Sequence, residues 1–165
     1  MKPPATEVEE DSPWGKDYLA FTLADYECAT DHGRVIETRN YDRQALLPLT
    51  ASLEYVRGGA VVDGTHVPVI DLGARLGIAP SCESPQAAIF FAMVHAKVLG
   101  FVVSQGFDRT ILRSWQISAA LPAQLPFAGQ YLEGVGKSGF RSSLLIDLEA
   151  LLPQQEVEQL VARLR

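Results

Sequence analysis

The sequence predicts a mainly β protein, built as barrels or as a sandwich rather than around a parallel sheet. Short apolar runs alternate with turns rich in glycine and proline, and few segments have helical spacing. A phrase made of a strand, an aspartate and a helical turn occurs twice, at residues 65–76 and again at 144–152. The two aspartates are Asp71 and Asp147. This repetition suggests a molecule made of two similar halves.

The N-terminal part of the chain alternates expected strands with polar turns. At residues 18–23 apolar side chains alternate with smaller or polar ones, which is the period of a half-buried strand. Asp63-Gly64 separates two short apolar runs and is a strong hairpin signal. The expected elements up to residue 67 are a disordered acidic tail (1–16), strands at 18–23 and 26–30, a helical turn and strand within 32–38, a loop at 46–57, and a hairpin at 61–67.

The first copy of the repeated phrase follows this hairpin. A β-type run at 67–70 ends at Asp71, a residue type that caps helix N-termini. Residues 72–76 are therefore expected to form one or two helical turns, ended by Gly77. Pro68 cannot donate a ladder hydrogen bond, so it limits its strand to an edge or a bulge.

A Pro- and Ser-rich segment near 78–87 is interpreted as a joint between the halves, after which the pattern restarts. Residues 88–94 are apolar on both faces of a strand and should lie between two packed layers. The remaining expected elements are strands at 98–103 and 140–146, a long ordered loop at 119–130, and an amphipathic C-terminal helix at 154–165, whose apolar face carries Val157, Leu160, Val161 and Leu164.

Composition bounds the possible functions. The 165 residues suit one domain, or two small subdomains that share a core, and the hydrophobic content of 47% is enough for a sizeable interior. The formal charge of −6 leaves no basic footprint for nucleic acid or for an anionic membrane. No apolar run approaches the ~18 residues of a membrane span, and no signal core is visible. We expect a soluble cytoplasmic protein without direct membrane insertion.

One glycine-rich segment imitates a nucleotide-binding motif. Residues 134–139 match the letters GxGxxG, which binds a pyrophosphate only where a strand runs into a helix. Here the glycines lead into the strand expected at 140–146, so a hairpin is the better interpretation. The Gly-Lys-Ser at 136–138 also fails as a phosphate loop. That motif needs a glycine at position 131, and this position is Tyr131.

The other reactive side chains do not assemble into a site in the sequence. The three histidines are scattered and have no metal-ligand spacing, and neither cysteine has a nearby cue for a lowered pKa (His32, His66 and His95; Cys28 and Cys82). Asp71 and Asp147 could be an acid–base pair, but helix capping in each half explains their position better. We assign no catalytic residue, metal ligand or cofactor.

Several phrases, taken together and in order, resemble the CheW family of chemotaxis coupling proteins. The most recognisable is Val67-Pro68-Val69-Ile70-Asp71-Leu72. The resemblance covers about residues 17–153, with the C-terminal helix at 154–165 beyond it. The other phrases that carry it are 18–23, 34–37 with 41–42, 98–103, 131–136 and 144–148.

The resemblance implies two five-stranded SH3-like β-barrels packed on a shared core. It also implies a non-enzymatic adaptor that joins chemoreceptor tips to the regulatory domain of a sensor histidine kinase, a domain of the same fold that docks barrel to barrel. Carried over by position, Val35, Glu37 and Gly58 are expected to contact partners. Gly100 and Val102 are expected beside the groove that takes the receptor helix. For Val35, Gly100 and Val102, plain strand packing is an equally good interpretation.

One position departs from the family pattern. The family usually has Asn-Leu-Arg-Gly before the proline strand, whereas this chain has Val61-Val62-Asp63-Gly64. Two carboxylates, Glu37 and Asp63, would then repel each other and lose a charge-assisted hydrogen bond. Either Arg39 or Arg57 takes over as the cation, or the partner surface differs. Arg57 and Asp63 therefore join Val35, Glu37, Gly58, Gly100 and Val102 as the expected partner-binding residues. Our hypothesis is a divergent coupling protein of a specialised chemosensory system, such as one that controls type IV pili and twitching.

Two other function classes remain as alternatives. An SH3-like or OB-like barrel that binds nucleic acid, or another non-kinase partner, should show a basic face with interleaved aromatic residues. A small enzyme should show a catalytic triad, a metal cluster or a true phosphate loop. The acidic composition and the scattered reactive residues favour the adaptor.

Overall fold

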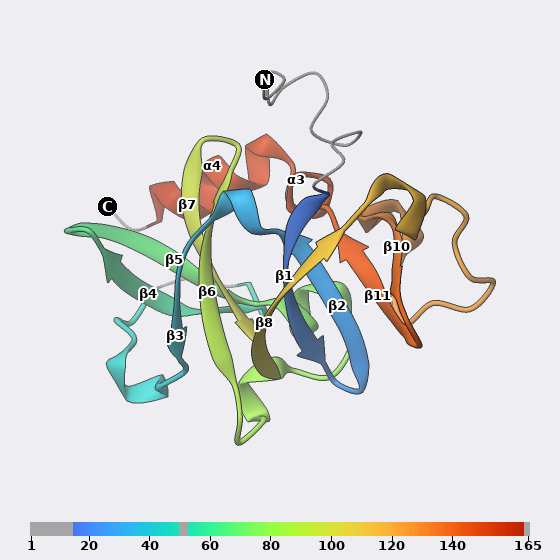
Figure 1. Ribbon diagram of the computed structural model, residues 1–165. Helices are drawn as coiled ribbons and strands as arrows, with labels where there is room; N and C mark the ends of the chain where they lie inside the picture. The colour runs from blue at the N-terminus through green and yellow to red at the C-terminus, as the bar shows by residue number, and fades with distance from the viewer. Residues whose placement is uncertain (1–14, 50–52, 164–165) are drawn as a thin grey trace.

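The chain folds into two β-sheets that pack on each other, as a computed structural model shows for residues 15–49 and 53–163 (Figure 1). The six-stranded sheet has the order β8 (Gln105–Leu112), β1 (Lys16–Leu23), β2 (Tyr26–Asp31), β11 (Arg141–Ile146), β10 (Leu132–Ser138) and β9 (Ile117–Ser118). The five-stranded sheet has the order β3 (Val35–Asn40), β6 (Ala88–Val94), β7 (Lys97–Val103), β5 (Thr65–Asp71) and β4 (Val56–Val62). The predicted mainly β class is confirmed, and the described strands form a six-stranded and a five-stranded sheet where two five-stranded barrels were expected.

The helices are short. The α-helices are α2 (Leu72–Leu76), α3 (Leu148–Leu151) and α4 (Gln154–Ala162), and the 3₁₀ turns are η1 (His32–Arg34), η2 (Arg43–Ala45), η3 (Ser81–Glu83), η4 (Ser114–Gln116) and η5 (Gly129–Tyr131). In Figure 1 the five-stranded sheet lies at the left and the six-stranded sheet at the right, with α3 and α4 above them.

The two sheets do not correspond to the two halves of the sequence. The five-stranded sheet takes the continuous stretch 35–103, and both ends of the chain build the six-stranded sheet. The predicted joint near 78–87 is therefore wrong as a boundary, because it connects β5 to β6 within one sheet. β5 pairs in parallel with β7, and a parallel pair needs a crossover connection. The segment 78–87, which the sequence analysis interpreted as a joint, is part of that crossover connection.

The repeated phrase is a true structural repeat. β5 ends at Asp71 before α2, and β11 is followed by Asp147 before α3; both strands make a parallel pair, β5 with β7 and β11 with β2. The Asp71 carboxylate accepts from the N–H of Ala74 at 3.0 Å, and that of Asp147 from the N–H of Glu149 at 3.0 Å. The predicted role of both aspartates as helix caps is confirmed.

The repeat extends to the strand that precedes each phrase. The N–H of Asp71 donates to the carbonyl of Tyr55 at 2.7 Å, and that of Asp147 to the carbonyl of Tyr131 at 2.8 Å. Three residues after each tyrosine, a bulge brings a glycine against a neighbouring carbonyl: a Cβ on either Gly58 or Gly134 would lie 2.6 Å from an oxygen. Each sheet is therefore built around the same Tyr–Gly–Asp frame.

One apolar core lies between the two sheets. The ring of Phe90 on β6 stacks on Phe21 of β1 at 5.3 Å and on Phe101 of β7 at 5.1 Å between centroids, with Phe107 of β8 edge-on at 6.1 Å. The next residue along β6, Phe91, points to the opposite side, into a separate core inside the five-stranded sheet. The prediction that 88–94 lies between two packed layers is confirmed.

Other predicted elements agree with the structure in most places. The strand at 26–30, the hairpin at Asp63-Gly64, the helical turn before β3 and the loop after residue 118 are confirmed. β8 was not predicted, because its residues are mostly polar or exposed and show no clear alternation. Residues 1–14 of the predicted tail lie outside the described residues, and β1 begins at Lys16, inside the predicted tail.

The C-terminal helix packs on the core between the sheets. Pro153 is the N-cap of α4, and Val157 and Leu160 on its inner face are buried, as predicted. Leu164 and Arg165 lie outside the described residues.

A single arginine ties this helix to the frame of both sheets. The guanidinium of Arg75 on α2 lies over the rings of Tyr55 and Tyr131, at 5.5 and 5.7 Å, and its Nε pairs with Glu156 of α4 at 3.1 Å. Cation–π contacts and an ion pair thus meet on one cation, which fixes α2, α4 and both tyrosines relative to one another.

The Asp71 carboxylate makes the stability of the fold depend on pH. Its carboxylate is fully buried, accepts from the N–H groups of Ala74, Ser81 and Cys82, and lies 3.5 Å from Arg57 Nε. Burial alone would raise the pKa of the Asp71 carboxyl, but the three N–H donors outweigh it and hold that pKa below its usual value.

A carboxyl whose pKa is depressed by folding stabilises the fold above its ordinary pKa of about 4, and this stabilisation is lost as the pH falls. We expect Asp71→Asn to lower the free energy of unfolding by about 3 kcal/mol at about pH 7, and by much less near pH 3. Urea unfolding at both pH values measures this, with the exposed Asp25→Asn as control. An equal loss at both pH values would contradict the account.

The Gly58 bulge gives a second prediction. Gly58 has φ +152°, and a Cβ there would lie 2.6 Å from the Leu47 carbonyl oxygen, whereas Gly139 has φ +63° with open space around it. We expect Gly58→Ala to cost about 3 kcal/mol, because the chain that bridges at Leu47 must move, and Gly139→Ala to cost about 1 kcal/mol from backbone strain alone. Thermal unfolding of both variants checks this, and equal losses would count against it.

Candidate functional site

All seven residues that the sequence selected for partner binding belong to the five-stranded sheet. Its edge strands are β3 and β4, and β7 lies near its centre. The structure places the seven on β3, β4, the β4–β5 turn and β7, as follows: Val35 and Glu37; Arg57 and Gly58; Asp63; Gly100 and Val102.

Arg39 joins the two edge strands. Its Nη2 donates to the Val61 carbonyl of β4 at 2.8 Å, and its Nε pairs with the Glu37 carboxylate of β3 at 2.6 Å. Its guanidinium also lies 4.7 Å from the centroid of the Phe91 ring. The sheet therefore curls until the Arg39 side chain of its first strand reaches its last strand at Val61, close to the turn that carries Asp63.

The charges at this edge act on one another. The hydrogen bond from Arg39 lowers the pKa of Glu37, and the charge of Arg39 adds to that shift. The pKa of Arg39 is raised, first by Glu37 and further by the charge of Asp63. The sequence offered Arg39 and Arg57 as the cation beside Glu37 and Asp63. In the structure Arg39 is the one that pairs with Glu37.

Arg57 serves a different purpose. Its Nε lies 3.5 Å from the buried Asp71 carboxylate, and its Nη1 donates to the Glu54 carbonyl at 2.9 Å. The side chain is about one quarter exposed and turns toward the frame of the sheet. Arg57 therefore belongs to the support of the edge rather than to its charged rim.

Gly100 and Val102 lie inside the molecule. Val102 has no exposed surface and packs into the core of the five-stranded sheet, not into the core between the sheets. A Cβ on Gly100 would come within 2.8 Å of the Phe91 ring. Val35 is half-buried against the shared core. For Gly100 and Val102 the structure favours strand packing, because β7 is covered by β5 and β6 on its two sides.

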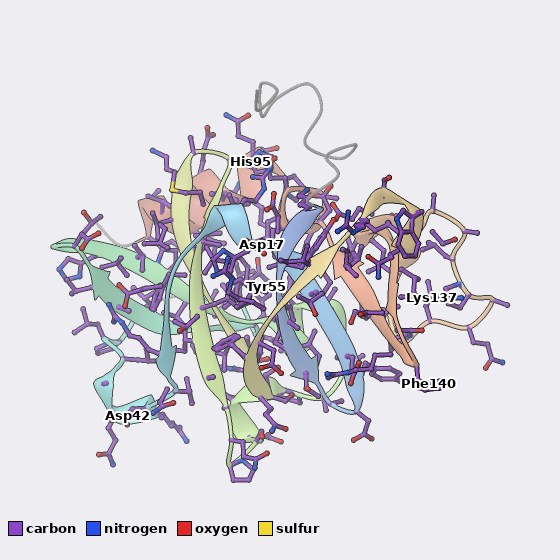
Figure 2. All side chains as sticks on the ribbon, viewed as in Figure 1. Asp17, Asp42, Tyr55, His95, Lys137 and Phe140 are labelled. Atoms are coloured by element: carbon purple, nitrogen blue, oxygen red, sulfur yellow. The ribbon has the colours of Figure 1, made fainter. Side chains whose placement is uncertain are left out.

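An apolar hollow lies between the charged edge residues. It has a volume of about 250 Å³ and lies between β3, the 42–47 segment and β4, with Phe91 at its base. Leu47 and Val61 at its rim are 38% and 43% exposed. Figure 2 shows Asp42 on the segment that follows β3, at this side of the molecule. The sequence had not marked Leu47 or Val61, because exposure of single apolar residues depends on how β3 closes on β4.

A second apolar area lies on the other sheet. Phe140, in the β10–β11 turn, is fully exposed, and Tyr26 is 43% exposed. Figure 2 shows Phe140 at the opposite side of the molecule from Asp42. The sequence analysis had placed Phe140 in the strand expected at 140–146 and had not marked it as exposed, whereas β11 begins one residue later, at Arg141.

The described residues were compared with the needs of a metal site and of a reactive thiol. Among residues 15–49 and 53–163, no group of three or more His, Cys, Asp or Glu side chains could hold a metal ion. Burial raises the pKa of Cys28 to about 12, and burial followed by a hydrogen bond to Asp71 raises that of Cys82, so neither thiol is an activated nucleophile. The GxGxxG letters fall on the β10–β11 hairpin, as predicted. No helix in the described part of the chain is long and apolar enough to cross a membrane.

A curled β-sheet whose exposed edge combines charges with an apolar hollow is the kind of surface that a protein-interaction module presents. The chain belongs to the CheW family: the family model for the CheW-like domain matches residues 17–156.

Named relatives and a solved structure agree with this assignment. The chain is 29% identical over 143 residues to the chemotaxis protein CheW of Klebsiella aerogenes, which covers 87% of this chain and 85% of that protein. It is 28% identical over 143 residues to a probable chemotaxis protein CheW of Rhizobium etli, covering 87% and 91%. The crystal structure of the scaffolding protein TtCheW from Thermoanaerobacter tengcongensis has the same fold, with a TM-score of 0.74 at 21% identity, covering 86% of this chain and 95% of that one.

Proposed function

We propose that this protein is a non-enzymatic chemosensory adaptor that links chemoreceptor tips to the regulatory domain of a sensor histidine kinase. The observation that carries the proposal is the CheW-like match over residues 17–156, which takes up nearly the whole chain. Relatives that carry the name chemotaxis protein CheW, and a neighbour described as a scaffolding protein, support it. Both proposed partners are met in the cytoplasm, where we place the protein.

The structure supports a role in holding two partners apart and in register. A single apolar core joins the two sheets, and exposed apolar residues lie at opposite sides: Leu47 and Val61 on one, Phe140 and Tyr26 on the other. Exposed apolar patches on soluble proteins commonly mark interaction sites. We assign the β3–β4 edge to the kinase regulatory domain, because Glu37, Gly58 and Asp63 all lie there.

The receptor is the second proposed partner. Gly100 and Val102, which the family resemblance connects with receptor binding, are buried. Their influence on the receptor would therefore act through the shape of β7 and not through direct contact.

Asp63 supports a specialised system rather than a general one. It stands where the family usually has a cation, and Arg39 now neutralises Glu37 beside it. A chemosensory pathway with its own kinase, such as one that controls type IV pili and twitching, is the setting we propose for such a changed surface.

The test is a calorimetric titration of the purified protein against the regulatory domain of the chemotaxis-type kinase from the same cell. We expect saturable binding of one molecule to one, since the β3–β4 edge occurs once in the chain. A matched titration with a domain of the same fold from an unrelated kinase serves as the control. The kinase half of the proposal fails if the folded protein shows no heat of binding while the domain is folded and competent in kinase regulation.

A further inference from the structure

The β3–β4 edge and the adjoining 42–47 segment carry the carboxylates of Glu37, Asp42 and Asp63 and the guanidinium groups of Arg39 and Arg43. Arg39 pairs with Glu37 and donates to the carbonyl of Val61, two residues before Asp63. The charge of Asp63 also acts on this guanidinium, but only Glu37 forms an ion pair with it. Arg57 on β4 is directed to Asp71 and adds little positive charge to the rim.

The turn holds Asp63 outward. Asp63 has φ +49° and Gly64 has φ +77°, the left-handed pair that closes a tight two-residue hairpin. β4 and β5 pair up to Val62 and Thr65 on either side of this turn, so the position of Asp63 is fixed by the ladder. Its side chain is exposed, and among the described residues it makes no hydrogen bond or ion pair. A partner can thus reach this carboxylate without displacing anything.

An apolar centre lies next to these charges. Leu47 and Val61 rim the hollow of about 250 Å³, with Arg39 along one wall. Protein interfaces commonly combine an apolar centre with a polar rim, and complementary charge at the rim selects the partner. The edge has both parts in one place.

We propose that this edge selects a partner that presents a lysine or arginine to Asp63 and an apolar side chain to the hollow between Leu47 and Val61. The occupant is the kinase regulatory domain, so this inference rests on the proposed function. Arg39 is a positioning residue: it ties β3 to β4 through the Val61 carbonyl and pairs with Glu37. A partner with an anion at this place would face the exposed Asp63 carboxylate, and it is rejected by repulsion.

The experiment compares charge variants in the same calorimetric titration. We expect Asp63→Asn to weaken binding to the kinase regulatory domain about fivefold, and Asp63→Lys at least about tenfold, because the second variant sets like charges against each other. Glu158→Lys, the same charge change on the exposed face of α4, is the matched control and should stay within about twofold of the unchanged protein. Raising the salt from about 50 to about 300 mM should weaken the unchanged protein more than Asp63→Asn.

The role of Arg39 is tested by its energetic coupling to Asp63 in a double-mutant cycle, and not only by the loss of binding in a single variant. We expect Arg39→Gln to weaken binding, and the effect of Asp63→Asn to change by at least about threefold in the Arg39→Gln background. A residue that only stabilises the fold would lower the thermal midpoint but leave the effect of Asp63→Asn unchanged. Circular dichroism of each variant separates unfolding from loss of binding.

The outcomes separate the two proposals. If the unchanged protein does not bind the domain, the proposed function fails and this inference falls with it. If the unchanged protein binds, but Asp63→Lys binds equally well or more tightly, the partner does not present a cation and the inference alone is overturned. Equal weakening by Asp63→Lys and Glu158→Lys would also overturn it, because the effect would then be one of net charge.

Discussion

The rest of the structure depends on one shared apolar core. Phe90 stacks between Phe21 and Phe101 and so joins a strand of one sheet to two strands of the other. Because β6 also buries Phe91 on its opposite side, the central strands of the five-stranded sheet have no free face. What remains available to a partner is the place where the sheet curls and its edges meet. The proposed binding surface lies there, between β3 and β4.

The structural repeat explains how one frame can serve two different sides of the molecule. Tyr55 and Asp71 in one sheet correspond to Tyr131 and Asp147 in the other, with a glycine bulge three residues after each tyrosine. The position before each glycine has diverged, since Arg57 precedes Gly58 and Glu133 precedes Gly134. Arg57 pairs with the buried Asp71, whereas the Glu133 carboxylate accepts from the Tyr18 hydroxyl at 2.9 Å. Conserving the frame and changing its polar residues gives each sheet its own surface.

Local signals in the sequence were sufficient to predict the local secondary structure in most places. An aspartate before a helical turn, an Asp-Gly hairpin and a strand apolar on both faces each depend on neighbouring residues, and the structure bears them out. The division of the chain between the two sheets could not be predicted from local signals, because the parallel pairing of β11 with β2 joins residues more than a hundred positions apart. For the same reason the sequence left the choice between Arg39 and Arg57 open. Whether Arg39 or Arg57 reaches Glu37 depends on how far β3 closes on β4, and sequence spacing does not contain that distance. For Gly100 and Val102 the sequence did not decide between strand packing and contact with a partner. Their burial in the structure favours strand packing.

The central claim is that the edge formed by β3 and the β4–β5 hairpin is the side that meets the kinase regulatory domain. Hydrogen–deuterium exchange of the protein with and without that domain tests it most directly, because it locates binding without any substitution. The account predicts slower exchange of backbone amides in residues 37–42 and 58–66 when the domain is bound, and little change at the turns around Ala24 and Phe140. Binding without slower exchange in residues 37–42 and 58–66 would contradict it.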